Sequence, residues 1–162
     1  MFCKKVMVIG AGTMGSGIAQ VFLTHGCDVI LNDIKQEFID GGVKKIDKSL
    51  TKLVAKEKMT QADKDAAMGR LTGFVEITKD NMKDVDLVVE AAIEDMKIKG
   101  QIFKNLGEVC PPETILASNT SSLPITKIAA ATNRPDKVIG MHFFNPAPVM
   151  KLIELINGIA TS

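Results

Sequence analysis

The sequence has no tryptophan or tyrosine, and aromatic residues make up only 4% of its 162 positions. Side chains that stack on nucleic-acid bases are therefore in short supply. Charge gives nucleic acid no support either, because 20 Lys and Arg residues nearly balance 19 Asp and Glu residues, for a net charge of +1. The composition predicts that nucleic acid is not a partner, although it leaves room for a local basic patch.

Cysteine is scarce as well. Cys3, Cys27 and Cys110 are odd in number and share no C-x-x-C spacing, which argues against a disulfide framework or a thiolate metal site. We therefore expect no metal centre and a reducing, cytoplasmic setting. Long apolar runs are also missing, and the short one at the N-terminus leads directly into a glycine motif. The chain thus has neither the pattern of a membrane span nor that of a signal peptide, and we expect no membrane partner.

What is present is a regular alternation of apolar runs and amphipathic stretches. Apolar residues make up 46% of the chain, which excludes disorder, and the length suits one domain. The expected strands are Val6–Ile9, Val29–Leu31, Phe74–Ile77, Val85–Ala91, Thr114–Ser118 and Val138–Phe143, with Lys151–Ile156 as a further, edge strand. The expected helices are Thr13–His25 closed by Gly26, Gln36–Lys56, a short helix capped near Thr60, Asp95–Cys110 and Leu123–Ala131. This alternation predicts an α/β, Rossmann-type, doubly wound and mostly parallel sheet with helices on both faces.

A glycine motif joins the first strand to the first helix. Its residues are Gly10, Ala11, Gly12, Thr13, Met14 and Gly15, a G-x-G-x-x-G sequence. The first glycine permits a tight turn, the second lets a pyrophosphate approach the backbone, and the third lets helix and strand pack closely. The motif alone is weak evidence, and the plain alternative is a glycine turn beside a solvated aspartate. Asp33, at the end of the second strand, is placed to hold ribose hydroxyls and predicts NAD rather than NADP, a preference that Lys35 softens.

Three later segments carry a resemblance to a known family. They are Glu90-Ala-Ala-Ile-Glu-Asp-Met-Lys-Ile-Lys99, Ala117-Ser-Asn-Thr-Ser-Ser122 and Gly140-Met-His-Phe-Phe-Asn-Pro146. With the glycine motif, they resemble the short-chain-acyl members of the 3-hydroxyacyl-CoA dehydrogenase family, from Lys4 to the last residue. The resemblance implies NAD-dependent oxidation of a (3S)-3-hydroxyacyl-CoA, with 3-hydroxybutyryl-CoA as the expected substrate. It also implies the reverse reduction of acetoacetyl-CoA, in fatty-acid or butyrate metabolism.

The resemblance also implies a second domain. Members of the family continue into an all-helical domain that forms homo-oligomers and completes the active site. The sequence stops where that domain is expected to begin, so we interpret residues 1–162 as the NAD-binding domain alone. We expect such a domain to bind NAD with little or no turnover.

By resemblance, three residues carry the chemistry. His142 takes the substrate hydroxyl proton, Glu154 pairs with His142, and Ser121 bonds the substrate oxygen. Each has a plainer alternative. His142 would be a core histidine, Glu154 an outward-facing edge glutamate, and Ser121 or Ser122 the cap of the following helix.

The remaining residues that the resemblance singles out hold ligands. Glu94, Lys99, Ser121 and Asn145 correspond to positions near the cofactor, and Ser49, Lys56 and Ser121 to positions that hold coenzyme A. The alternative for Glu94 and Lys99 is a pair of solvated charges at a helix start. Ser49 and Lys56 lie in a lysine-rich helix, whose stripe of lysines is commonly only a solvated face.

Two other functions remain open at this stage. One is a non-catalytic dinucleotide-binding module, and the other is a Rossmann dehydrogenase for a different acid. The joint presence of His142, Ser121 and Glu154 favours the dehydrogenase over the module. The N-T-S-S and H-F-F-N-P segments argue against the different acid.

Overall fold

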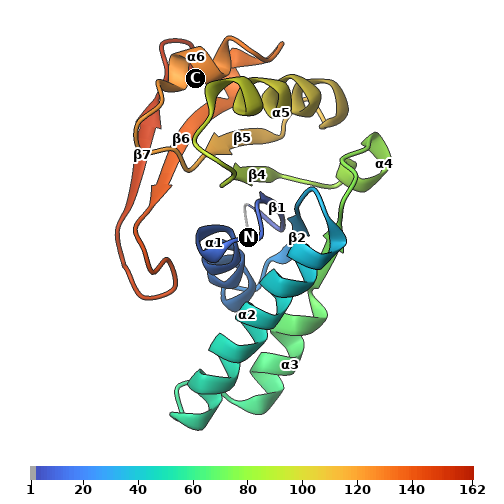
Figure 1. Ribbon diagram of the computed structural model, residues 1–162, viewed down its shortest axis with the longest axis vertical. Coiled ribbons are helices and arrows are strands. Elements are labelled where there is room, and N and C mark those ends of the chain that lie inside the picture. Colours follow the sequence, from blue (N-terminus) through green and yellow to red (C-terminus); the bar gives the residue numbers. More distant parts are fainter. Residues whose placement is uncertain (1–2) are drawn as a thin grey trace.

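The computed structural model describes residues 3–162 and contains one seven-stranded sheet (Figure 1). The strands are β1 (Lys5–Ile9), β2 (Asp28–Asn32), β3 (Leu71–Phe74), β4 (Leu87–Glu90), β5 (Ile115–Ser118), β6 (Val138–Phe143) and β7 (Ile153–Asn157). Their order is β3-β2-β1-β4-β5-β6-β7, and only β7 pairs in an antiparallel direction. The predicted doubly wound, mostly parallel sheet is confirmed.

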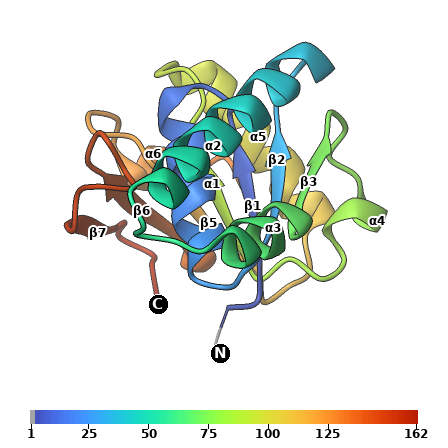
Figure 2. The same cartoon turned by 90° about the horizontal axis from the view of Figure 1, so that it is seen from below.

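Helices cover both faces of this sheet. The helices are α1 (Thr13–Thr24), α2 (Gln36–Ala55), α3 (Gln61–Gly69), α4 (Lys79–Met82), α5 (Met96–Val109) and α6 (Ile125–Ala129), with a 3-10 turn, η1, at Pro135–Lys137. Figure 1 shows α1 and α2 on one face and α5 and α6 on the other. Figure 2 shows α2 crossing over α1, with α3 beside it. Because the helices change face between β1 and β4, the ligand crevice of such a sheet is expected at the carboxyl ends of these two strands.

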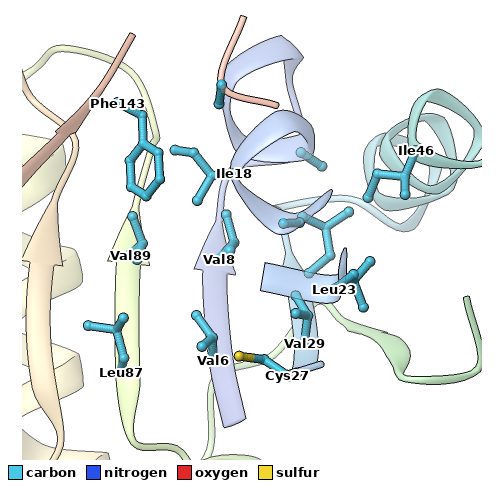
Figure 3. Packing of buried hydrophobic residues seen from close by; sticks show 14 of the residues in the cluster. Val6, Val8, Ile18, Leu23, Cys27, Val29, Ile46, Leu87, Val89 and Phe143 are labelled. Atoms are coloured by element: carbon cyan, nitrogen blue, oxygen red, sulfur yellow. The ribbon is translucent and has the colours of Figure 1, made fainter. Parts of the chain in front are cut away.

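Alternate residues of the central strands build two apolar cores. Val6 and Val8 of β1 pack with Ile18 and Leu23 of α1, as Figure 3 shows, whereas Met7 and Ile9 pack on the opposite face beneath α5. Both sets are buried. This explains why the strand sequences are continuously apolar instead of alternating, since each side chain meets a helix layer whichever way it points.

Local sequence signals fix several element ends as predicted. Gly26 follows α1 with φ +88, a left-handed conformation that glycine adopts without strain. Thr60 Oγ1 accepts a hydrogen bond from Asp63 N at the start of α3, and Asp95 Oδ1 accepts one from Ile98 N at the start of α5. These signals mark where α1 ends and where α3 and α5 begin.

The third strand and its surroundings differ from the prediction. The sequence predicts a strand at Phe74–Ile77, but β3 is Leu71–Phe74, and the short α4 was not predicted. Gly73 explains the difference, because an added Cβ there would lie 2.6 Å from Ile39 Cγ2, so the strand needs a residue with no β propensity. The more apolar residues that follow leave the sheet and line a hollow. Two other predicted elements are shorter in the structure, β4 at Leu87–Glu90 and α6 at Ile125–Ala129.

Candidate active site

The glycine turn leaves open space at the N-terminus of α1. A Cβ on Gly15 would lie 1.7 Å from the Gly10 carbonyl oxygen, and Gly10 itself has φ +103, so both positions require glycine for the fold. Gly12 differs, because a Cβ there would have no protein atom within 4 Å. Gly12 is the N-cap of α1, whose first turn, beginning with Thr13 and Met14, carries no acidic residue. The turn therefore fits a diphosphate, which the free N–H groups of a helix start attract.

Asp33 is bound to the same turn. Its Oδ2 accepts a hydrogen bond from Ala11 N (2.8 Å), and its Oδ1 accepts one from Ile34 N (2.7 Å). Beside it lies an apolar hollow of about 610 Å³ whose walls include Ile34, Val75 and Ile98. A carboxylate at the mouth of an apolar hollow suits a nucleoside, because the base enters the hollow and the ribose hydroxyls meet the carboxylate.

A second hollow, of about 260 Å³, lies at the carboxyl ends of β4, β5 and β6. It is lined by Met14, Ala91, Ala92, Glu94, Lys99, Asn119, Ser121, His142 and Phe143. The structure thus brings His142 and Ser121, which lie 21 positions apart in the sequence, to one site. Ser121 is exposed, and its hydroxyl makes no hydrogen bond with any other residue of the described chain. A ligand that enters this hollow therefore meets an imidazole and a free hydroxyl.

His142 is not a core histidine. It is half-buried near the end of β6, and its ring lies 4.7 Å from the ring of Phe144. Phe143, the neighbouring residue in β6, points the other way into the core against Phe22 of α1. The alternation of the strand therefore turns His142 to the opposite face of the sheet from Phe143.

The turn that carries Ser121, residues 119–123, is held by its neighbours. Asn119 N donates to the Glu90 carbonyl oxygen (2.8 Å), and Asn119 Oδ1 accepts from Phe143 N (2.8 Å). Thr120 Oγ1 accepts from Leu123 N (3.0 Å) and from Ser122 N (3.4 Å). The suggestion that Ser121 or Ser122 caps the following helix is wrong, because Thr120 closes the turn and the N-cap residue of α6 is Pro124, with no side-chain cap.

A buried ion-pair network lies beneath this turn. Lys99 Nζ is 2.6 Å from Glu90 Oε2, 2.8 Å from Glu90 Oε1 and 3.2 Å from Glu94 Oε1. The side chain of Lys99 is 1% exposed and that of Glu90 is 0% exposed. Lys99 is therefore not the solvated charge that the alternative allowed. Lys99 is buried and is one of the residues that line the hollow next to His142.

Glu94 forms the upper end of the network. Its Oε2 accepts hydrogen bonds from Thr120 Oγ1 (2.6 Å) and Ser122 Oγ (2.9 Å). Partial burial opposes ionisation of this carboxyl, but the hydrogen bonds from Thr120, Ser122 and Lys99 outweigh it and hold the pKa of Glu94 below its ordinary value. Glu94 is thus an ionised carboxylate at neutral pH, at the rim of the hollow.

Glu154 lies directly opposite His142 in the β6–β7 pairing. Both side chains point to the same face of the sheet, since residues paired across a ladder share a face. Glu154 is exposed, and within residues 3–162 no hydrogen bond or ion pair joins its carboxylate to the imidazole. The register thus brings the predicted partners together, while the contact itself stays a prediction.

Of the residues predicted to hold coenzyme A, only one lies along a separate groove of about 1110 Å³ between α1, α2, α3 and the β6–β7 connection. Ser49 lines this groove, as do Lys58 and Lys151. Lys56, the residue after the last turn of α2, is exposed and is not among the lining residues. Asn145 follows β6 on an exposed loop and likewise does not line the hollow next to His142.

Metal and membrane features are both missing from the described part of the chain. Residues 3–162 contain no group of three or more His, Cys, Asp or Glu side chains that could hold a metal ion. No helix in this part is long and apolar enough to cross a membrane. The three cysteines are free, and burial, the largest influence on each, raises the pKa of Cys3 and of Cys110 to about 11.

Comparison with known families gives a direct assignment. Residues 5–162 match the family model described as "3-hydroxyacyl-CoA dehydrogenase, NAD binding domain". The chain belongs to this family. NAD, the cofactor predicted from Asp33 and the glycine turn, is the cofactor of the family.

Individual members of the 3-hydroxyacyl-CoA dehydrogenase family are similar over the whole chain. A 3-hydroxybutyryl-CoA dehydrogenase of Clostridioides difficile is 52% identical over 158 residues, and a probable 3-hydroxybutyryl-CoA dehydrogenase of Bacillus subtilis is 49% identical over 162 residues. The chain spans 56% of the length of each. Among solved structures, the 3-hydroxybutyryl-CoA dehydrogenase of Escherichia coli K12 superposes with a TM-score of 0.96 at 44% identity, over all of this chain and 34% of that one.

Residues that sequence reasoning did not select also belong to this site. Glu90 and Ser118 end neighbouring strands, and Thr120 and Asn119 fix the turn around Ser121. A signal for Glu90 exists in the sequence, because it is an acid that directly follows the apolar run Leu87-Val-Val89 in a buried strand. The other three residues give no such signal, since polar residues after a strand are ordinary in loops.

Proposed function

We propose that this chain is the NAD-binding, base-bearing part of a 3-hydroxyacyl-CoA dehydrogenase that interconverts 3-hydroxybutyryl-CoA and acetoacetyl-CoA. The observation that carries the proposal is the meeting of His142 and Ser121 in one hollow at the strand ends. An imidazole titrates near neutral pH and can take or return a hydroxyl proton, while a free hydroxyl can donate to the same oxygen.

Each group then has a stated part in the reaction. In the oxidation direction His142 accepts the proton of the substrate hydroxyl, and Ser121 donates a hydrogen bond to the substrate oxygen. Glu154, opposite His142 in the ladder, stabilises the imidazolium that results. NAD, when bound, supplies the acceptor for the hydride. The glycine turn and Asp33 hold its diphosphate and ribose, and Glu94, Lys99 and Asn145 are proposed to lie near its other end.

Turnover of the 162-residue chain tests the proposal. NADH oxidation is followed with acetoacetyl-CoA at high protein concentration, for the wild type and for His142→Ala. The expected result is slow turnover that disappears in the variant, while the Kd for NADH, measured by fluorescence, is unchanged. NADH binding without any wild-type turnover, from a folded chain, would mean that catalysis needs a part of the relatives that this chain does not span, or that the chain only binds the dinucleotide.

We also propose that the coenzyme A part of the substrate lies along the groove that Ser49 lines. The groove passes between α2 and the β6–β7 connection, and its lining includes Phe143, the residue that follows His142 in β6. Lysines at its border suit the phosphates of coenzyme A, because each contributes a charge-assisted hydrogen bond. Lys56→Glu is expected to raise the KM for acetoacetyl-CoA and to spare NADH binding, and equal damage to both would count against this placement.

The setting of the reaction is inferred from the same relatives. The substrate class is taken from their names, which refer to 3-hydroxybutyryl-CoA. We infer a place in fatty-acid or butyrate metabolism, in the cytoplasm, where free thiols such as the three found here persist.

A further inference from the structure

Glu90 is a fully buried acid at the centre of the molecule. It is the last residue of β4, the strand next to β1 at the point where the helices change face, and its side chain is 0% exposed. A buried carboxylate is costly unless its oxygens are satisfied. Here Oε1 accepts from Ser118 Oγ (2.7 Å) and Oε2 from Ala92 N (2.6 Å), and both accept from Lys99.

Lys99 links Glu90 to Glu94. An ammonium has three hydrogens, and the three carboxylate oxygens within reach of Nζ are both oxygens of Glu90 and Oε1 of Glu94. Glu90 thus fixes where the ammonium sits, and the ammonium fixes one oxygen of Glu94. Without the Glu90 charge, Lys99 would be drawn toward Glu94 alone and would leave its present position.

The other oxygen of Glu94 holds both neighbours of Ser121. Thr120 and Ser122 donate to the same atom, Oε2, from either side of Ser121. The Ser121 hydroxyl is the one in this run that stays free within the described chain. A displacement of Glu94 would therefore move the whole 119–123 turn relative to His142.

We propose that Glu90, through Lys99 and Glu94, is a positioning residue that fixes Ser121 opposite His142. Its charge does no proton transfer and touches no substrate, because it has no exposed surface. Its part is to keep the 119–123 turn in one conformation. Since catalytic groups must be held within a fraction of an ångström, a loosened turn would lower the rate more than the binding of ligands. The kinetic form of this statement rests on the proposed function.

Hydrogen exchange tests the positioning without any need for turnover. Exchange of the 119–123 amides is measured by mass spectrometry in the wild type, Glu90→Gln and Thr114→Val. Thr114 is the matched control, because it is a buried residue whose hydroxyl donates to Val85 O (2.7 Å) outside the network. Glu90→Gln is expected to speed exchange in the turn by about tenfold or more, and Thr114→Val to leave it unchanged. Equal exchange in the two variants would overturn the proposal.

A second variant covers the case in which Glu90→Gln does not fold. Glu90→Gln combined with Lys99→Met removes both buried charges, which a fold tolerates better than one unpaired charge. This double variant is expected to keep the sheet folded and still to show fast exchange at 119–123. Slow exchange there, as in the wild type, would show that the network does not hold the turn.

Steady-state kinetics with acetoacetyl-CoA provide a separate test of the positioning. Glu90→Gln is expected to lower kcat about 100-fold, and this loss should exceed its effect on the Kd for NADH by about tenfold or more. In a Ser121→Ala background the same substitution should cost less than about twofold, because it acts through Ser121. Full additivity would overturn the proposal. Hydrogen exchange decides the positioning even if the wild type binds NADH without turnover, so a failure of the kinetic test and a failure of the positioning stay distinguishable.

Discussion

The glycines of the turn at residues 10–15 are of two kinds. Gly10 and Gly15 are needed by the fold, whereas Gly12 faces space that no protein atom fills. Since the fold does not require glycine at position 12, the reason for it is the close approach of the diphosphate to the backbone. Glycines required by the backbone conformation can therefore be told apart from a glycine required for ligand binding.

Gly12→Ala is expected to weaken NADH binding by about tenfold or more while leaving the melting temperature little changed, because the added methyl occupies the path of the diphosphate. Fluorescence titration and thermal melting measure the two quantities. Gly69→Ala in α3 is the matched control, since a Cβ there also meets no atom within 4 Å. A variant at Gly12 that binds NADH as the wild type does would contradict the assignment of this turn to the diphosphate.

Glu94 gives a prediction in pH. Its pKa in the folded chain lies below the ordinary value, so its ionised form stabilises the fold above the unfolded-state pKa, and this stability is lost as the pH falls through the folded-state pKa. The difference in melting temperature between the wild type and Glu94→Gln should therefore be largest near neutral pH. It should shrink below about pH 4, the ordinary range of a glutamate. A difference that is the same at pH 7 and pH 3 would show that the charge of Glu94 does not matter.

At the scale of elements, the antiparallel β7 is the feature that completes the site. A sixth parallel strand alone would leave His142 at the end of the sheet with nothing beside it on the outer side. The return of the chain along β6 places Glu154 across from it, only 12 positions later in the sequence. The proposed pairing of His142 with Glu154 thus depends on the hairpin of β6 and β7.

Glu154→Gln is expected to lower kcat and to shift the pH dependence of acetoacetyl-CoA reduction to lower pH, because a neutral amide supports the imidazolium less well than a carboxylate. Steady-state rates from pH 5.5 to 9 measure both effects. Lys127→Gln, which removes an exposed charge from α6, serves as the control and should leave the profile unchanged. An unaltered profile in Glu154→Gln would leave this residue as an outward-facing edge glutamate.

Most elements could be predicted from the sequence because the apolar runs are buried on both faces, and buried runs are easily recognised. The prediction was wrong at β3. The close approach of Ile39 requires glycine at position 73, and no local sequence pattern reveals this contact. The sequence also left the parts of Thr120, Ser121 and Ser122 open, because they are equivalent by type and only the position of Glu94 tells them apart. The residues proposed to touch ligands were selected by resemblance, whereas the residues that hold the turn around Ser121 were not selected.

At the scale of the whole molecule, one edge is apolar and open. The exposed large apolar residues of the β6–β7 connection, β7 and the residues after it are Val149, Met150, Leu152, Ile153, Leu155, Ile156 and Ile159. Ile159 is 91% exposed and Leu155 is 63% exposed. The strand also presents a free row of backbone donors and acceptors at the edge of the sheet. Contiguous apolar surface together with an unpaired strand edge favours association.

The 162-residue chain is therefore expected to associate as its concentration rises, and Leu155→Lys should reduce this association. Sedimentation velocity over a range of concentrations measures it. Thr72→Lys places the same charge on β3, at the opposite edge of the sheet, and should have little effect. Equal effects of the two substitutions would indicate that net charge, and not the β7 edge, governs association.

The burial of Lys99 has a chemical consequence if the proposed acyl-CoA substrate is correct. Acyl-CoA compounds acylate amines whose nitrogen lone pair is free, and the nitrogen of Lys99 is enclosed among three carboxylate oxygens and shielded from solvent. The lysines of α2, such as Lys48 and Lys52, are exposed near the proposed coenzyme A groove and have no such protection. Spontaneous acylation by the proposed acyl-CoA substrate should therefore accumulate on the exposed lysines of α2 and leave Lys99 unmodified.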